Sequence, residues 1–143
     1  MLVNRSVPSS TVIPELVYDD VEQAVDWLCR AFGFSVRWSA GDHRAQLHVG
    51  DGAVVVRDHP PDIDAGAAVP GARSSVLVRV EDVDALHAGA LASGARIVRE
   101  PRDHPYGERQ FTAEDPAGHR WTFSQSIADV APEEWGGVSV DLS

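Results

Sequence analysis

The chain has 143 residues, of which 43% are hydrophobic and 24% charged, and its formal net charge at pH 7 is −10. These values indicate a single globular domain, and the negative charge argues against nucleic acids and anionic membrane surfaces as partners, because phosphate groups would be repelled. The sequence contains no run of about 18 apolar residues and no signal-peptide pattern, so we expect a cytoplasmic protein that does not associate with membranes.

The first half of the chain is predicted to contain one amphipathic helix, over residues 20–33. The apolar residues at the spacing of one helix face are Val21, Ala24, Val25, Leu28 and Phe32. Asp19 or Asp20 can cap the start of this helix, and Gly33 can end it in a left-handed conformation. The single cysteine, Cys29, lies in the helix, where we expect a small core residue rather than a nucleophile.

Short apolar runs flank this helix at residues 14–18 and 34–38, and both are predicted to be strands. Residues 45–57 have the pattern of a β-hairpin that turns at residues 50–52, where the sequence is Gly-Asp-Gly. Residues 58–74 are rich in Pro, Gly and Ala and are predicted to be a linker.

The second half repeats this order of elements. A helix is predicted over residues 82–94, with Asp82 as its cap and Gly94 as its end. Its apolar face is expected to contain Val83, Leu86, Ala90 and Leu91. Strands are predicted on both sides of it, followed by a hairpin over residues 109–125 with its turn around residues 115–118. The chain is therefore predicted to be an internal repeat of two strand–helix–strand–strand–strand units.

This tandem plan and two segments resemble a known family. The segments are DDVEQAVDWLCRAFGF near the start and YGERQFTAEDPAGHRWTFSQ near the end. Together they resemble the glyoxalase/bleomycin-resistance/dioxygenase superfamily, also called the vicinal oxygen chelate superfamily, over residues 11–126. The resemblance implies an α+β fold of two βαβββ modules, at 11–66 and 74–126, followed by a tail over 127–143. It implies an open eight-stranded barrel-like cavity with the helices outside, and a homodimer with the cavity within one chain or between two.

Strand alternation predicts which side chains face this hollow. Leu47, Val49, Trp121 and Phe123 are expected to point toward the helices, and Ser124 toward the hollow. The other expected hollow-lining residues are Glu15, Gln46, His48, Arg79, Arg120 and Thr122.

Two of these candidates, together with Trp38 and Arg109, have alternative roles that the sequence leaves open. His48 could bind a ligand or act as a general base, or it could be a hydrogen-bonded barrel histidine. Glu15 could meet a cationic ligand or hold a catalytic proton, or it could pair with Arg79 or Arg120. Trp38 could stack on a flat ligand, or it could pack or contact a second subunit.

Arg109 could bind a carboxylate or phosphonate at the cavity mouth, or it could anchor the nearby Glu114 or Asp115. His119, in the hairpin turn, is expected to have a structural role such as bonding turn carbonyls. His43, His59 and His104 are expected to be merely solvated, and Trp135 could pack against the barrel or reach a second subunit.

Members of this family that use a metal hold it with one His, Glu or Asp from each of four inner strands. The resemblance places Ile13, Val56, Ser75 and Thr122 at these positions, and a shift of one residue at the second position offers Arg57. Divalent transition ions need imidazole, thiolate or carboxylate ligands, so we expect no metal and no other cofactor.

The leading interpretation is therefore a metal-free protein that binds a small molecule, aromatic or cationic, and protects by sequestration as bleomycin-binding relatives do. The cationic preference follows only from the net charge. One alternative is a lyase, isomerase or dioxygenase that uses His48 and Glu15 in a non-standard metal site or as a general base. Another is a structural dimer whose hollow is filled by its own side chains.

Overall fold

The computed structural model describes residues 2–59 and 74–139 of the chain. The first unit consists of β1 (Glu15–Val17), α1 (Val21–Phe32), β2 (Ser35–Ala40), β3 (Arg44–Val49) and β4 (Gly52–Arg57). The second unit consists of β5 (Val76–Arg79), α2 (Val83–Ala92), β6 (Arg96–His104), β7 (Glu108–Glu114) and β8 (Arg120–Ser126), and the short 3-10 helix η2 (Pro132–Glu134) follows. The predicted α+β fold of two βαβββ units is confirmed, while most of the predicted linker lies outside the described residues.

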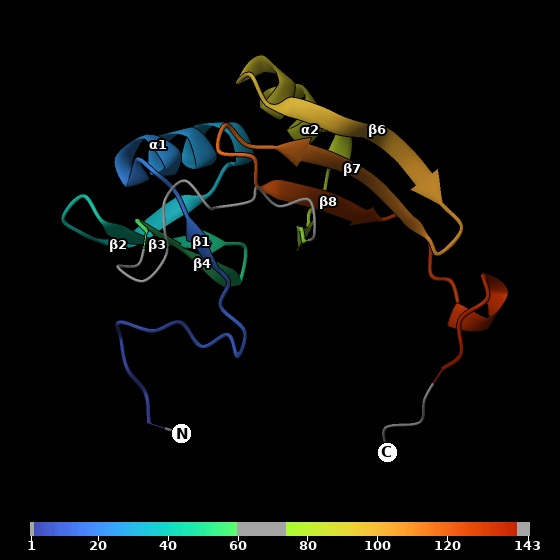
Figure 1. Cartoon of the computed structure of the whole chain (residues 1–143). Helices are drawn as coiled ribbons and strands as arrows, with labels where there is room; N and C mark the ends of the chain where they lie inside the picture. The colour runs from blue at the N-terminus through green and yellow to red at the C-terminus, as the bar shows by residue number, and fades with distance from the viewer. Residues whose placement is uncertain (1, 60–73, 140–143) are drawn as a thin grey trace.

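Both units have the same sheet topology. The strand order is β1-β4-β3-β2 in the first sheet and β5-β8-β7-β6 in the second, and the first strand of each unit runs parallel to the last. Figure 1 shows the two sheets side by side. Both helices lie above them, and the terminal segments lie below. Among the described strands no pairing joins the two sheets, so they do not close into a barrel.

The sequence signals at the ends of the helices act as expected. The Asp20 and Asp82 carboxylates accept hydrogen bonds from the backbone N–H groups of Gln23 and Ala85, each at 3.0 Å. Gly33 ends α1 with a φ of 76°, in the left-handed region where a side chain would be strained. None of the helices in the described residues is both long and apolar enough to cross a membrane.

The hydrophobic core lies between the sheets and the helices and crosses from one unit to the other. Phe32 and Phe34 of the first unit contact Trp121 of the second, with ring centroids 5.7 and 5.3 Å away. Phe32 also lies 4.9 Å from Phe123. Aromatic contacts of this kind stabilise the packing beyond the area that they bury, so these rings hold the two units together.

Two features of the helices differ from the prediction. Leu91 was expected on the apolar face of α2, but it is 56% exposed. The residues of that helix that are buried are Val83 and Ala90. Trp27 lies outside the predicted face of α1 yet is buried, and its indole N–H donates to the Ser93 carbonyl at 3.0 Å. That bond ties α1 to the end of α2.

The turn before β8 also joins the two units. Asp115 is 4% exposed, and its carboxylate accepts hydrogen bonds from the Tyr18 hydroxyl at 2.6 Å and from the Trp121 indole at 3.1 Å. The same carboxylate accepts from the backbone N–H groups of Ala117 and His119. The Nε2 atom of His119 donates to the Val17 carbonyl at 2.8 Å, which is the structural role expected for this histidine. The DPAGH turn therefore positions β8 against β1.

Candidate functional site

Each sheet has one face under a helix and one opposite face, which we call its inner face. The strand register places Leu77, Thr122, Thr112 and Arg99 in one row across the inner face of the second sheet. The next row contains Arg79, Ser124, Gln110 and Arg102. The buried Trp121, Phe123 and Phe111 lie between these rows on the helix side, so the predicted facing of β8 is confirmed.

The inner face of the first sheet is covered at its centre. Gln46 is 3% exposed, and its carbonyl oxygen accepts a hydrogen bond from Arg37 at 2.6 Å. Arg37 and Trp38 also donate to the carbonyls of Arg5 and Ser6, so the N-terminal segment lies against β2. The protein's own groups therefore occupy the centre of this face.

The remaining candidates from the first unit are not gathered around a cavity. The Glu15 carboxylate lies 2.6 Å from Arg44 and 3.8 Å from Arg57, so its partners are arginines of its own sheet rather than Arg79 or Arg120. His48 is exposed near the end of β3, where its register partners are Ser35 and Ala53.

The inner face of the second sheet, in contrast, is hollow. A cavity of about 650 Å³ lies over it, with Leu77 and Thr122 on one side and β6 on the other. Leu77 lies on the inner side of the edge strand β5 and is 61% exposed. An adjoining groove of about 400 Å³ shares Ser75 and Leu77 and extends to Arg120 and to Leu16 of β1. Three of the predicted site residues, Arg79, Arg120 and Thr122, therefore belong to this face.

Two sets of side-chain hydrogen bonds lie along the floor of the hollow. The hydroxyls of Thr112 and Thr122 lie 2.8 Å apart. The Gln110 amide donates to the Ser124 hydroxyl at 2.9 Å, and that hydroxyl donates to Glu108 at 2.7 Å. Hydrogen bonds from Ser126 and Ser124, together with the charge of Arg79, hold the pKa of Glu108 below its usual value, so this group is a carboxylate at neutral pH. The floor is thus polar and ordered without a ligand.

Strand β6 supplies three site residues that sequence reasoning missed. Its nine residues pair with the seven of β7, and the register shifts twice, between Ile97 and Arg99 and between Arg99 and Arg102. Each shift adds one residue to β6, which is a β-bulge and changes the side to which the following side chains point. As a result Arg99, Arg102 and His104 all line the hollow.

His104 lies at the end of this basic strand and stacks on Tyr106, with ring centroids 5.0 Å apart. Partial burial, followed by the charges of Arg102 and Arg99, lowers the pKa of His104 below its ordinary value, against a smaller opposite effect of Asp103. The expectation that His104 is merely solvated is therefore incomplete, because the ring forms part of the cavity wall.

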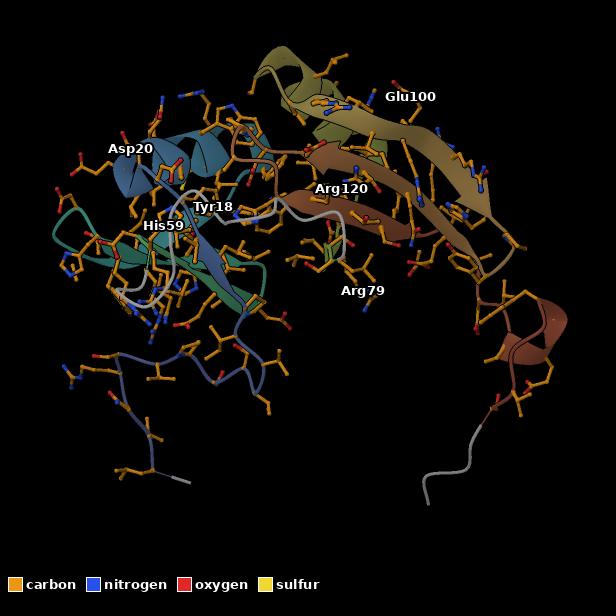
Figure 2. All side chains as sticks on the ribbon, in the orientation of Figure 1. Tyr18, Asp20, His59, Arg79, Glu100 and Arg120 are labelled. Carbon is orange, nitrogen blue, oxygen red and sulfur yellow. The ribbon has the colours of Figure 1, made fainter. Side chains whose placement is uncertain are left out.

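Arg109 lies elsewhere, on the helix side of β7. Its guanidinium donates to Asp84 in the first turn of α2 at 3.1 Å and to Asp103 at 3.0 Å. These partners replace the predicted Glu114 or Asp115, and they turn the Arg109 side chain away from the hollow. Figure 2 shows the contrast between the two faces, with Arg79 below the second sheet and Glu100 above β6.

A second cavity, of about 340 Å³, lies outside the sheets between α1 and the turn at residues 115–118. Its walls include Tyr18, Trp27 and Asp115. The polar atoms of these three side chains already bind one another or the protein backbone. This cavity therefore offers few free groups for recognition, and we regard the inner face of the second sheet as the better candidate.

The positions that the family pattern assigns to metal ligands do not suit a metal ion. Val56 is fully buried on the helix side of β4, and Ile13, Ser75 and Thr122 lack imidazole, thiolate or carboxylate groups. Within residues 2–59 and 74–139 no group of three His, Cys, Asp or Glu side chains is placed to hold a metal. We therefore derive no chemistry through a metal at this site.

Comparison with known proteins agrees with this fold. Residues 11–123 match the model of the Glyoxalase/Bleomycin resistance protein/Dioxygenase superfamily. The uncharacterized protein Mb0911c of Mycobacterium bovis is 30% identical over 131 residues, which cover 85% of this chain and 86% of that protein. TioX from Micromonospora sp. ML1 is 35% identical, with a TM-score of 0.66 and coverage of 83% of this chain and 100% of TioX.

A glyoxalase/bleomycin resistance protein from Streptomyces sp. CB03234 is also similar. It is 26% identical, with a TM-score of 0.65, over 81% of this chain and 100% of the solved structure.

Proposed function

Because this chain belongs to the glyoxalase/bleomycin resistance protein/dioxygenase superfamily, we propose that it binds a small molecule on the inner face of its second sheet, without a metal ion. The observation that carries the proposal is the cavity of about 650 Å³ over an ordered polar floor. A cavity of this size suits a small organic ligand, and hydrogen-bonding groups placed among apolar ones are what fix a ligand's orientation. Protection by sequestration is the biological role that we infer.

The composition of the cavity wall supports this proposal. Leu77 gives an apolar surface that is exposed in the protein without ligand, and burying it under a ligand would be favourable. Thr122 and Gln110 offer hydroxyl and amide groups, and the His104 ring, which stacks on Tyr106, forms one end. Binding therefore has both a hydrophobic and a polar component.

An enzyme built on Glu15 and His48 has less support. The Glu15 carboxylate is engaged by Arg44 and Arg57, and His48 does not line any of the cavities described above. We therefore make binding, rather than catalysis by this pair, the function to test first.

We also propose that the protein is a homodimer and is cytoplasmic. The terminal segments expose apolar side chains, namely Leu2, Val3, Val12, Trp135 and Val138. Both segments lie below the sheets, on the side of the open inner faces (Figure 1). A second copy placed there would cover these residues and close the hollow. Cell fractionation tests the location.

The test of binding is a thermal-shift screen of a diverse small-molecule library against protein dialysed with a chelator. We expect some compounds to raise Tm, because a ligand that binds only the folded state stabilises it. The Leu77→Trp variant, which fills the hollow, should lose the shift. The matched control Gln23→Trp, which places the same side chain at the outer cavity beside α1, should keep it. Hits that respond only to Gln23→Trp, or no hits, would contradict the proposal.

A further inference from the structure

The inner face of the second sheet is basic although the whole chain is strongly acidic. Five arginines lie in its rows or along its edge: Arg96, which pairs with Glu114, and Arg79, Arg99, Arg102 and Arg120. Within the described part of the chain none of the last four makes a salt bridge, whereas Arg96 and four of the six arginines elsewhere do, namely Arg30, Arg44, Arg57 and Arg109. With a net charge of −10 there is no shortage of carboxylates, so four arginines without a salt bridge on one face need an explanation.

The bulges in β6 produce this arrangement. Strict alternation back from Arg102 would place Glu100 and Val98 on the inner face, with Arg99 on the helix side. The register instead pairs Arg99 with Thr112 and Arg102 with Gln110, so both guanidinium groups share the inner face. The Glu100 carboxylate lies 2.9 Å from His87 of α2, although its residue forms part of the cavity rim. Because of the bulges, the Arg99 guanidinium rather than the Glu100 carboxylate belongs to the inner face.

The positions of these arginines suit one bound anion. Thr112 and Gln110 are two residues apart on β7, so Arg99 and Arg102 start about 7 Å from each other along the strand. Two long arginine side chains at that separation can both reach one oxyanion, and each can donate two parallel hydrogen bonds to it. The Thr112 and Gln110 side chains lie below them on the floor. Two acidic residues share this face and both have partners: Glu108 accepts a hydrogen bond from Ser124, and the Glu114 carboxylate lies 3.4 Å from Arg96.

We infer that the ligand of this site is a small organic anion, whose carboxylate or phosphate-type group binds between Arg99 and Arg102. The inference rests on the proposed function and specifies its ligand class. It replaces the expectation of a cationic ligand, because that expectation used the net charge of the whole chain and the local charge of the cavity is opposite. The stacked rings of His104 and Tyr106 favour an anion that carries a flat apolar part.

The experiment compares three probes of the same shape and different charge: benzoate, benzyl alcohol and benzylammonium. Each is titrated into 15N-labelled protein, and binding is followed by the amide shifts of β6 and β8. We expect benzoate to bind at least about tenfold more tightly than the other two, since a charge-assisted hydrogen bond contributes more than a neutral one. Arg99→Gln and Arg102→Gln should each weaken benzoate binding about tenfold. Arg30→Gln, on the exposed face of α1, should leave it unchanged.

The outcomes separate this inference from the proposed function. If benzyl alcohol or benzylammonium binds the inner face as tightly as benzoate or more tightly, the inference of an anionic ligand is wrong, but the proposed binding site still stands. Benzoate binding that is unaffected in the folded Arg102→Gln variant would also overturn the anion site. If none of the three probes shifts the amide signals of the inner face, the inference of an anionic ligand is wrong. If the library screen also yields no binder, the proposed function is wrong as well.

Discussion

Asp115 shows how one residue of the family motif serves the fold rather than a reaction. Its buried carboxylate accepts hydrogen bonds from Tyr18, Trp121 and two backbone N–H groups, which together replace the water that it loses. Burial and the neighbouring carboxylate raise the pKa of Tyr18, so its hydroxyl stays protonated and can donate throughout the physiological pH range. The sequence indicated a structural turn here but gave no sign of Tyr18 as its partner.

Replacing Asp115 by Ala should lower the free energy of unfolding by about 3 kcal/mol, because it leaves several buried donors without an acceptor. Tyr18→Phe removes one of those donors and should cost about 1.5 kcal/mol. Urea denaturation measures both. Asp26→Ala, which removes an exposed carboxylate paired with Arg30, should change stability by less than about 0.5 kcal/mol. An Asp115→Ala protein as stable as the Asp26→Ala control would refute this account of the turn.

The basic cavity makes a second prediction at the scale of a residue. The charges of Arg102 and Arg99 contribute to the lowered pKa of His104, so removing one of them weakens that effect. Arg102→Gln should therefore raise the pKa of His104 toward its ordinary value, and bound benzoate should raise it in the unmodified protein. NMR titration of the ring proton measures the pKa. A value that is unchanged in Arg102→Gln would mean that the two side chains do not interact.

At the scale of elements, the sequence predicted regular features and missed irregular ones. Asp20, Asp82 and Gly33 are local signals, and they mark the helix ends where expected. The bulges of β6 depend on pairing with β7, which alternation along one strand cannot reveal. This is why Arg99 and Arg102 were not among the candidate site residues. The side of β7 to which Arg109 points was also missed, since its acid partner Asp84 belongs to α2.

The connection between β6 and β7 depends on a glycine for two reasons. Gly107 has a φ of 83°, and a Cβ atom there would lie 2.5 Å from the Ala128 carbonyl oxygen. Gly94 has a φ of 84° and open space at the same position, so it is a matched control. Gly94→Ala should cost about 1 kcal/mol from backbone strain alone, and Gly107→Ala at least about 2 kcal/mol.

Gly107→Ala should also release the tail that follows β8. The Gly107 carbonyl accepts hydrogen bonds from Ile127 and Ala128, and Trp135 contacts Tyr106 at a centroid distance of 5.7 Å. Hydrogen exchange should therefore become faster over residues 127–135 in Gly107→Ala and stay unchanged there in Gly94→Ala. Equal exchange in the two variants would show that the clash is relieved without moving the tail.

At the scale of the whole molecule, the inner faces of the two repeated units differ in exposure and in charge. The centre of the first face is occupied by Gln46, Arg37 and the N-terminal segment, and the second face is open and basic. The family resemblance predicted the common architecture from tandem repeats, but composition alone suggested a cationic ligand, whereas the groups that line the second face favour an anion. Net charge averages over both faces, and a binding site responds to the groups that line it.

The exposed apolar termini predict a dimer. Sedimentation velocity should give a mass twice that of the chain at micromolar concentration, because a second copy would bury apolar side chains that include Leu2 and Trp135. Removing residues 2–12 should weaken the dimer. A monomer at all concentrations would contradict this arrangement, while the hollow of a single chain could still be tested for binding.

The measurement that most directly tests the central claim is a map of amide shifts caused by the tightest compound from the library screen. We expect the largest changes on β5, β6, β7 and β8, at residues of the inner face such as Leu77, Arg102 and Thr122. Changes centred instead on α1 and the 115–118 turn, or on the face of the first sheet, would show that the ligand site lies elsewhere.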